Sequence, residues 1–388
     1  MIPLIQIIVG ARPNFMKAAP VVDEIRRRHS DWRIEVVHTG QHYDEKMSDL
    51  FFRQLGMPEP LVNLGVGSGS AAVQTARIMV ALEERFAGER PDLVIVFGDV
   101  NSTLAAALVT SKLGVKLAHV EAGLRSFDRT MPEEVNRILT DAVSDFLFVT
   151  EESGVKNLRS EGVAPGTIFL VGNTMIDTLL KHSERAFALD MPARLGIPRG
   201  RYVVVTLHRP ANVDDPQNLR RFVTAFLKLA DHDIPIVFPV HPRTAARLSE
   251  FGVAEQLASR PLIRLVDPLG YLEFLGTMRS AGAILTDSGG IQEEATILRV
   301  PCLTLRHNTE RPSTLAGGAN QLVGDDPQRI VRECLAIIGG ERHVVHTPPP
   351  LWDGMAAQRI CDVLEAELAN EERNASSATA RSSRLDPV

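Results

Sequence analysis

Short runs of apolar and β-branched residues recur along this chain, and longer amphipathic stretches separate them. This alternation is typical of β–α–β units, in which helices connect the strands of a parallel sheet. The runs fall into two sets. The first set covers residues 4–9, 34–38, 93–97, 116–120, 146–149 and 169–171, and the second covers residues 202–206, 236–239, 263–266, 283–286 and 302–305. Their continuous apolar character predicts strands buried on both faces, so we expect an α/β fold with two open sheets.

The chain of 388 residues exceeds the size of one ordinary hydrophobic core, which favours two domains. A helical stretch over residues 176–189 is followed by Pro192, Gly196, Pro198 and Gly200, which are typical of an interdomain connection. We therefore expect domains at residues 1–190 and 191–350. Residues 351–369 predict a helix across the domain seam, and residues 370–388 predict a disordered tail without apolar periodicity.

Composition indicates which partners the chain lacks. Apolar residues make up 44% and charged residues 23%, and the net charge of -6 forms no acidic or basic block, so neither nucleic acid nor a membrane is an expected partner. The three cysteines include no C-x-x-C pair, which argues against disulfides and zinc and favours a cytoplasmic location. The run at residues 4–9 does not resemble a signal peptide, and no segment is long enough to span a bilayer.

Ligands of doubly wound sheets bind beyond the carboxyl ends of the strands, so the residues after each run are the first candidates for a site. The first run leads into Gly-Ala-Arg12-Pro-Asn-Phe-Met-Lys17, which places two cations at a helix start that favours phosphate. A solvated helix start is the alternative. This turn lacks the G-x-G-x-x-G fingerprint, and Gly65, Gly67 and Gly69 are better interpreted as a flexible loop, so no dinucleotide cofactor is expected.

Carboxylates follow two of the next runs. Asp99 comes after the run at residues 93–97, where it can serve either chemistry or the cap of the next helix. Glu121 ends another run and has no capping role to offer. Glu133 and Glu134 lie in a first helical turn, where the helix dipole alone favours acids. Arg137 lies on the same helix face as Glu133, where it can pair with Glu133 or reach a phosphate.

Two histidines and a glycine pair stand at strand ends in the second half. His208 and His241 each follow an apolar run. A lone histidine is usually structural, but two at equivalent strand ends favour a role in the site. Ser288, Gly289 and Gly290 lie between a strand and a helix, a pattern that predicts a phosphate seat without metal. Glu294, one turn into that helix, can accept both hydroxyls of a ribose, although a solvated glutamate is the default. The D-x-D pattern at residues 231–233 lies away from the strand ends, so no metal site is expected.

Taken together, several motifs resemble those of the non-hydrolysing UDP-N-acetylglucosamine 2-epimerases over about residues 5–365. They are G-A-R-P-N-F-M-K, T-G-Q-H, F-G-D-V-N-S-T, H-V-E-A-G-L-R, M-P-E-E-x-N-R, T-L-H-R-x-x-N, D-S-G-G-I-Q-E-E-A and R-x-N-T-E-R-P, in the family's order. The resemblance implies a GT-B fold, with two Rossmann-like domains facing each other across a cleft. It also implies reversible epimerisation at C2 between UDP-GlcNAc and UDP-ManNAc, without cofactor or metal.

The resemblance also implies roles for individual residues. Those resembling the catalytic groups are Asp99, Glu121, Glu133 and His208, with Glu134 as the alternative to its neighbour. Those resembling the diphosphate ligands are Arg12, Lys17, Arg137, Ser288, Gly289, Gly290 and Arg311. Phe274 and His241 would contact the uracil side, and Glu294 the ribose. The effector subsite for UDP-GlcNAc resembles Gln41, His42, Gln74 and Arg209, and the family further implies a homodimer and a role in cell-surface polysaccharide synthesis.

Ordinary chemistry is consistent with this mechanism. The C2 proton is not next to a carbonyl, so UDP must leave C1 before a carboxylate can remove that proton and give a 2-acetamidoglucal. Clustered cations and a helix N-terminus favour the departing diphosphate. The rival functions are a retaining glycosyltransferase of the same fold, a hydrolysing epimerase, a non-catalytic nucleotide-sugar sensor and an epimerase of a modified sugar such as a diacetamido uronic acid.

Overall fold

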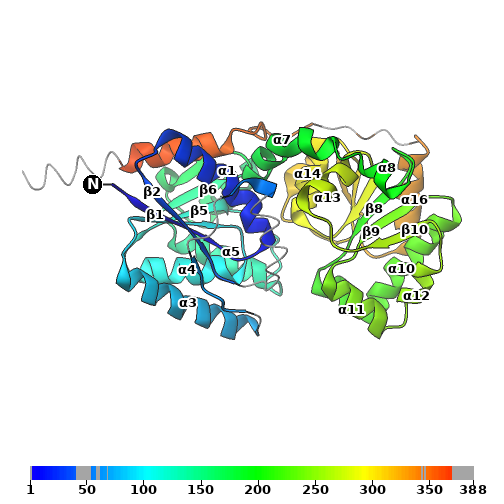
Figure 1. The fold of residues 1–388 in the computed structure, drawn as a ribbon, viewed down its shortest axis with the longest axis horizontal. Helices are drawn as coiled ribbons and strands as arrows, with labels where there is room; N and C mark the ends of the chain where they lie inside the picture. The colour runs from blue at the N-terminus through cyan, green and yellow to red at the C-terminus, as the bar shows by residue number, and fades with distance from the viewer. Residues whose placement is uncertain are drawn as a thin grey trace, which may run out of the picture.

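The protein is described by a computed structural model that covers residues 2–40, 54–57, 62–67, 69–341, 344 and 347–368. Two lobes lie side by side along its long axis, and each is built on one parallel sheet (Figure 1). The strand orders are β3-β2-β1-β4-β5-β6-β7 and β10-β9-β8-β11-β12-β13. Both orders reverse direction beside the first strand of the lobe, as in doubly wound Rossmann-like sheets. The expected α/β class with two such domains is confirmed.

The first sheet and its helices occupy the first half of the chain. Its strands are β1 (Leu4–Val9), β2 (Arg33–His38), β3 (Val62–Asn63), β4 (Leu93–Phe97), β5 (Lys116–Ala122), β6 (Phe146–Val149) and β7 (Ile168–Leu170). Its helices are α1 (Arg12–Arg28), α3 (Ala71–Gly88), α4 (Asn101–Lys112), α5 (Pro132–Val143), α6 (Glu152–Ser160) and α7 (Thr174–Phe187), with a 3-10 turn at Pro165–Thr167.

Apolar residues on alternate positions of these strands build a core on each face of the sheet. All residues of β1 and β4 are buried, as their continuous apolar sequences predict. Ile8 and Val96 face Ile78 and Leu82 of α3, whereas Ile7 and Ile95 belong to the core that α1 covers. Figure 1 shows α3 and α4 on one side of the sheet and α1 on the other.

The second sheet follows the same plan. Its strands are β8 (Val203–Thr206), β9 (Ile236–Pro239), β10 (Ile263–Val266), β11 (Ala283–Thr286), β12 (Cys302–Thr304) and β13 (Asn320–Leu322). Its helices are α8 (Met191–Leu195), α9 (Pro210–Val213), α10 (Pro216–Asp231), α11 (Pro242–Glu250), α12 (Ala254–Ala258), α13 (Tyr271–Arg279), α14 (Gly289–Leu298), α15 (Pro312–Ala316) and α16 (Pro327–Ile338). Phe226 of α10 packs edge-on against Phe238 of β9 in the core of this lobe.

Two edge strands were not expected from the sequence. β3 pairs with β2 through Val62 and Asn63 only, and β13 pairs with β12 over three residues of which two are polar. Runs this short and polar carry no strand signal of their own. Their pairing is a consequence of the exposed sheet edge beside them.

Helix α7 lies at the junction of the lobes. It packs against α1 of the first lobe and α13 of the second, and Met175 and Leu179 belong to a buried core that continues into both. The chain then returns to this region as a helix over residues 356–368. The carboxylate of Asp177 in α7 accepts the amides of Ala356 and Ala357 at 3.2 and 2.8 Å, which caps this helix.

The last helix lies on the first lobe beside the junction (Figure 1). Arg28 at the end of α1 pairs with Asp362 at 2.5 Å, and the indole of Trp352 donates to the carbonyl of Thr150 at 3.0 Å. The tail expected at residues 370–388 lies outside the described residues. Among the helices that the structure describes, none is long and apolar enough to cross a membrane.

Gly172 should be indispensable to this docking. Its φ is +90°, and a Cβ on it would lie 2.1 Å from the carbonyl oxygen of Leu351. We expect Gly172→Ala to lower the free energy of unfolding by about 2–4 kcal/mol, because it adds left-handed backbone strain to a backbone clash. Gly166→Ala is the matched control, since no atom lies within 4 Å of its added Cβ. Equal thermal stability of the two variants would contradict this account.

Candidate active site

The turn after β1 is fixed to the end of β4 by one asparagine. The side-chain oxygen of Asn14 accepts the amides of Gly10 and Ala11 at 3.2 and 3.1 Å, and its Nδ2 donates to the carbonyl of Phe97 at 2.8 Å. A Cβ on Gly10 would lie 2.0 Å from the hydroxyl of Ser102, so only glycine fits. This turn starts α1 and directs Lys17 toward β5. Arg12 opens the same helix, but its side chain lies outside the described residues.

Glu121 lies at the centre of the candidate site. It is the second-last residue of β5 and has a φ of +77°, where the pairing of β5 with β6 shifts register. Its carboxylate binds Lys17 Nζ at 2.6 Å and Arg311 Nη2 at 2.9 Å, and all three side chains are buried. Burial acts to raise the pKa of Glu121, but the charges of Lys17 and Arg311 outweigh it and hold the pKa below its ordinary value. Because Arg311 follows β12, this contact joins the two lobes.

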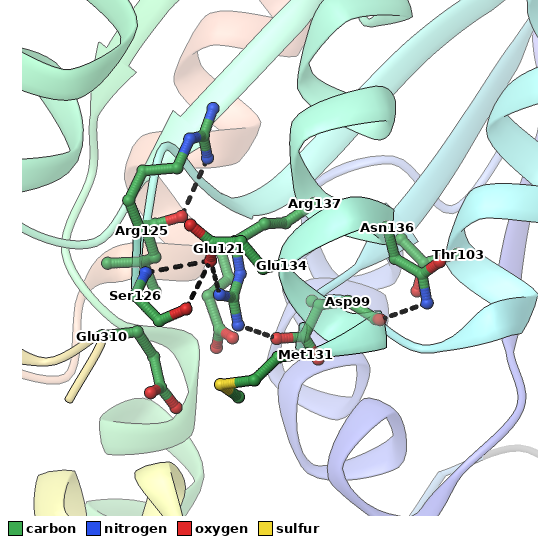
Figure 2. Close-up of polar contacts among 12 residues, drawn as sticks. Asp99, Thr103, Glu121, Arg125, Ser126, Met131, Glu134, Asn136, Arg137 and Glu310 are labelled. Atoms are coloured by element: carbon green, nitrogen blue, oxygen red, sulfur yellow. Dashed lines mark hydrogen bonds and ion pairs between the residues drawn. The ribbon is translucent and has the colours of Figure 1, made fainter. Parts of the chain in front are cut away.

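Asp99 lies beside Glu121 and is held by α5. Arg137 donates to the carboxylate of Asp99, and Asn136 Nδ2 donates to the Asp99 carbonyl at 2.8 Å (Figure 2). Burial acts to raise the pKa of Asp99, but Arg137 and Lys17 together lower it. The Asp99 side chain keeps an exposed fraction of 23%, so solvent or a ligand can reach it.

The two adjacent glutamates of α5 differ in their surroundings. The Glu134 carboxylate accepts the amide of Ser126 at 2.9 Å, the amide of Phe127 at 2.8 Å and an N–H of Arg137. It is 1% exposed, and Figure 2 shows it between Ser126 and Arg137. Glu133 is only half-buried. The hydrogen bonds of Glu134 therefore hold the loop before α5. Glu133 is the more exposed of the two glutamates and the one that a ligand can reach.

A buried aspartate organises the corresponding loop of the second lobe. Asp287, after β11, accepts the amides of His208 and Arg209 at 3.1 and 3.0 Å and the side-chain amide of Asn212 at 3.1 Å. Its carboxylate also lies 2.9 Å from His208 Nδ1. Burial acts to raise the pKa of Asp287, but these contacts lower it to about 2. His208 is thereby fixed at the end of β8, with its ring 6.0 Å from that of His241.

The expected phosphate seat is lined by further charges. Ser288 precedes α14, whose first residues are Gly289 and Gly290. A Cβ on Gly289 would lie 2.6 Å from a carboxylate oxygen of Glu310, so this acid lies against the glycine turn. Glu310 is bound by Arg209 at 3.1 Å and by Arg306 at 2.9 Å. Arg209, Arg306 and the carboxylate of Glu310 therefore lie together at the expected phosphate seat.

The remaining expected residues lie around this centre. Glu294 is buried in α14, and Phe274 is buried in α13 within the junction core. His241 is exposed and accepts the amide of Arg243 at 3.2 Å at the start of α11. Gln74 accepts from Asn101 Nδ2 at 2.9 Å, and Arg209 lies 3.9 Å from the sulfur of Met131 across the lobes. Gln41 and His42 lie outside the described residues.

Sequence reasoning missed several charged residues here. Asp287, Arg306 and Glu310 fix or line the second-lobe loops, and Glu293 of α14 lies 2.6 Å from Arg311 Nε. Burial raises the pKa of Glu293 to about 8. Asp287 and Glu293 stand within the D-S-G-G-I-Q-E-E-A motif, and this motif could have identified them from the sequence. The described residues contain no group of three or more His, Cys, Asp or Glu side chains that could hold a metal ion.

Comparison with known proteins identifies the class. A family model described as UDP-N-acetylglucosamine 2-epimerase matches residues 24–365. A Methanocaldococcus jannaschii protein named UDP-N-acetylglucosamine 2-epimerase is 42% identical over 369 residues, which cover 93% of this chain and 98% of the relative. A Pseudomonas aeruginosa UDP-2,3-diacetamido-2,3-dideoxy-D-glucuronate 2-epimerase is 41% identical and covers 92% and 98%.

A solved structure gives the same result. The crystal structure of the M. jannaschii UDP-GlcNAc 2-epimerase in complex with UDP-GlcNAc and UDP matches with a TM-score of 0.87, 42% identity, and coverage of 94% of this chain and 99% of that chain. Two doubly wound lobes whose strand-end loops meet at clustered carboxylates and arginines define an enzyme of the GT-B class. Within that class, the chain belongs to the UDP-N-acetylglucosamine 2-epimerase family.

The two glutamates of α5 should respond differently to neutralisation. Glu134→Gln removes a buried charge that pairs with Arg137, so we expect it to lower the free energy of unfolding by about 3 kcal/mol. Glu133→Gln changes a half-buried group and should stay within about 0.5 kcal/mol of the unmodified protein. Thermal or urea unfolding of both variants measures the difference. If Glu134→Gln is as stable as Glu133→Gln, the assignment of Glu134 to the loop is wrong.

Proposed function

We propose that the protein interconverts UDP-GlcNAc and UDP-ManNAc by inverting C2 of the sugar. The observation that carries this proposal is the cluster in which Arg311 of one lobe meets Glu121 of the other, beside Asp99 and Arg137. It combines proton acceptors with fixed cations at one place. The names of the matched relatives support the same activity.

The proposed chemistry begins with cleavage of the C1–O bond, whose electron pair leaves with UDP. The positive charge that develops at C1 acidifies the C2 proton, and a carboxylate removes it to give 2-acetamidoglucal. A second acid returns a proton to the opposite face of C2, and UDP adds again at C1. Fixed cations favour the departing diphosphate, because they cost no reorganisation when its charge develops.

We assign the proton transfers to Asp99, Glu121 and Glu133, and place His208 next to the sugar and diphosphate. The diphosphate ligands would be Arg12, Lys17, Arg137, Ser288, Gly289, Gly290 and Arg311. Phe274 and His241 would lie on the uracil side, and Glu294 would bind the ribose.

Ligand binding would change the basicity of Glu121. Lys17 and Arg311 hold the pKa of Glu121 low, and both are proposed diphosphate ligands. A diphosphate that takes over these cations removes the charges that lower the pKa. The pKa of Glu121 then rises, so the carboxylate becomes a stronger base when the substrate is in place.

A second candidate substrate is a UDP-diacetamido uronic acid. The P. aeruginosa relative bears that substrate in its name at 41% identity, almost the same as the M. jannaschii relative. Incubation with a panel of UDP-sugars and no acceptor distinguishes the two. The same assay excludes a retaining glycosyltransferase, which yields no epimer, and a hydrolysing enzyme, which releases the free sugar.

We also propose that UDP-GlcNAc activates the enzyme at a subsite beside the catalytic one. Arg209 and Gln74 are its described residues, and Arg209 lies between Glu310 and the loop of Met131. We further propose that the enzyme acts as a cytoplasmic homodimer that supplies precursors for cell-surface polysaccharides.

Product formed in heavy water should carry deuterium at C2. The prediction follows from two separate acid/base groups, because the proton removed by one carboxylate is not the proton delivered by the other. Mass spectrometry or proton NMR of the UDP-ManNAc formed from UDP-GlcNAc measures the incorporation. Complete retention of the original hydrogen would rule out separate groups on the two faces.

Substitutions of Asp99 and of the glycine turn should have different effects: the first should lower turnover and the second should weaken UDP binding. Asp99→Asn cannot take up a proton, so turnover should fall roughly 100-fold or more. Its UDP affinity should be kept or increased, because the substitution releases Arg137. Gly290→Asp should weaken UDP binding about tenfold or more by placing a negative charge at the seat.

Gly290→Asn is the matched control, since it has nearly the same size without the charge. A Cβ at this position lies 3.2 Å from the terminal methyl of Met175, so both variants meet the same neighbour. Calorimetric titration with UDP compares all three proteins. Equal losses of UDP affinity in Asp99→Asn and Gly290→Asp would make Asp99 a nucleotide ligand or a structural cap.

A further inference from the structure

His119 and Asp141 form a buried pair beneath the site. His119 points inward from β5 and is 0% exposed, and Asp141 comes from α5. His119 Nδ1 lies 2.7 Å from the Asp141 carboxylate, and Nε2 lies 2.8 Å from the carbonyl of Gly98. A carbonyl can only accept, so Nε2 carries a proton. A second proton must lie between Nδ1 and the carboxylate, because neither an unprotonated nitrogen nor an ionised carboxylate can donate.

The other oxygen of Asp141 binds the backbone just after Glu121. It accepts the amide of Gly123 at 3.1 Å and Nη1 of Arg125 at 2.7 Å. Arg125 is itself fixed by Glu161, with contacts of 2.8 and 2.6 Å. Burial acts to raise the pKa of Asp141, but His119 and Arg125 outweigh it and lower the pKa. The Asp141 carboxylate therefore lies between two side chains, His119 and Arg125, and both of these contacts are buried.

This pair contacts the backbone just after a strained residue and the backbone of the neighbouring strand end. Glu121 has a φ of +77° although it is not glycine, a conformation that persists only where the surroundings enforce it. Gly123, at φ +80°, packs so closely on Gly154 that a Cβ would lie 2.6 Å from its carbonyl oxygen. The Gly98 amide also donates to the carbonyl of Val120 at 3.0 Å. The strand ends that carry Asp99 and Glu121 are thus tied to each other.

We infer that Asp141 and His119 are positioning residues that fix the Glu121 and Asp99 carboxylates relative to each other. Asp141 holds the turn after Glu121, and His119 connects that aspartate to the carbonyl immediately before Asp99. Both side chains are buried, so they act through the backbone that they contact. The inference rests on the proposed function, since it matters for catalysis only if these carboxylates move protons.

Positioning of this kind affects turnover more than binding. Proton transfer requires the carboxylate within hydrogen-bond reach of C2, and a displacement of about 1 Å can cost roughly 100-fold in rate. Most of the proposed ligands of UDP lie on the second lobe, and Arg137 is the one that lies on α5. Asp141→Asn keeps the shape of the side chain but cannot remain an anion between His119 and Arg125, so the turn at Glu121 loses its anchor.

The test compares Asp141→Asn with Asp145→Asn. Asp145 accepts the amide of Leu117 at 2.9 Å and pairs with Lys116 at 3.3 Å, so it serves the opposite end of the same strand with the same chemistry. We expect Asp141→Asn to lower kcat about 100-fold, with KM and the Kd for UDP changed less than about threefold. Amide hydrogen exchange at Gly123 should become faster. Asp145→Asn should leave kcat and the exchange at Gly123 unchanged.

A double-mutant cycle with Glu121→Gln separates positioning from general stability. If Asp141 acts through Glu121, adding Asp141→Asn to Glu121→Gln should cost less than about threefold in kcat, because the group it positions is already inactive. Equal additional losses in both backgrounds would overturn the inference. The inference would also be overturned if Asp141→Asn had a kcat within threefold of the unmodified enzyme while Glu121→Gln was inactive.

Different experimental results would contradict the proposed function and this inference. Full activity of Glu121→Gln would overturn the catalytic role of Glu121 itself. If Asp141→Asn does not fold, His119→Gln is the second variant, because it retains one amide donor for Gly98 and leaves Asp141 with Arg125. It should show the same selective loss of kcat with faster exchange at Gly123, and unchanged kcat would contradict the inference.

Discussion

The structure depends on the carboxylate of Glu121 bound between two cations from different lobes. Lys17 reaches it from α1 and Arg311 from the loop after β12, and all three groups are buried. Removing either cation would leave the buried carboxylate with one compensating charge in place of two, and breaking a buried ion pair is destabilising. The contact between the lobes and the placement of this carboxylate therefore depend on the same ion pairs. If a diphosphate binds both cations, as we propose, ligand binding is coupled to release of Glu121.

The fold was largely predictable because its central strands are buried. β1 and β4 are mainly apolar, and the polar residues that follow them mark the edge where the site lies. β3 and β13 were not predictable, since two or three partly polar residues become strands only where a sheet edge offers them hydrogen bonds. Periodicity predicted a helix over residues 351–369, and the structure has one over residues 356–368. Its capping by Asp177 was not predicted, because those residues are far apart in the sequence.

The placement of the candidate site residues was predictable where it follows from the ends of strands and the starts of helices. Asp99, Glu121 and His208 stand at strand ends, and the glycines at 289 and 290 open a helix. Sequence reasoning missed Asp287, Glu310 and Asp141 because their contacts join segments that are distant in the sequence. Asp287 fixes the loop of His208, and Asp141 fixes the turn of Glu121. No spacing rule reveals such pairs, since the amides they accept are defined only by the folded backbone.

These contacts divide the buried carboxylates into two kinds. Glu134, Asp141 and Asp287 each accept backbone amides, so releasing them would leave unsatisfied donors inside the protein. Among the described residues, the recorded partners of the Asp99 and Glu121 carboxylates are instead the side-chain cations Lys17, Arg137 and Arg311. Long cationic side chains can turn toward an incoming anion without breaking the backbone structure. A carboxylate that loses such a partner becomes more basic at the moment a ligand arrives, whereas an amide-bound carboxylate stays fixed. The identity of the hydrogen-bond donor therefore distinguishes the acids that hold the site from those that can act in it.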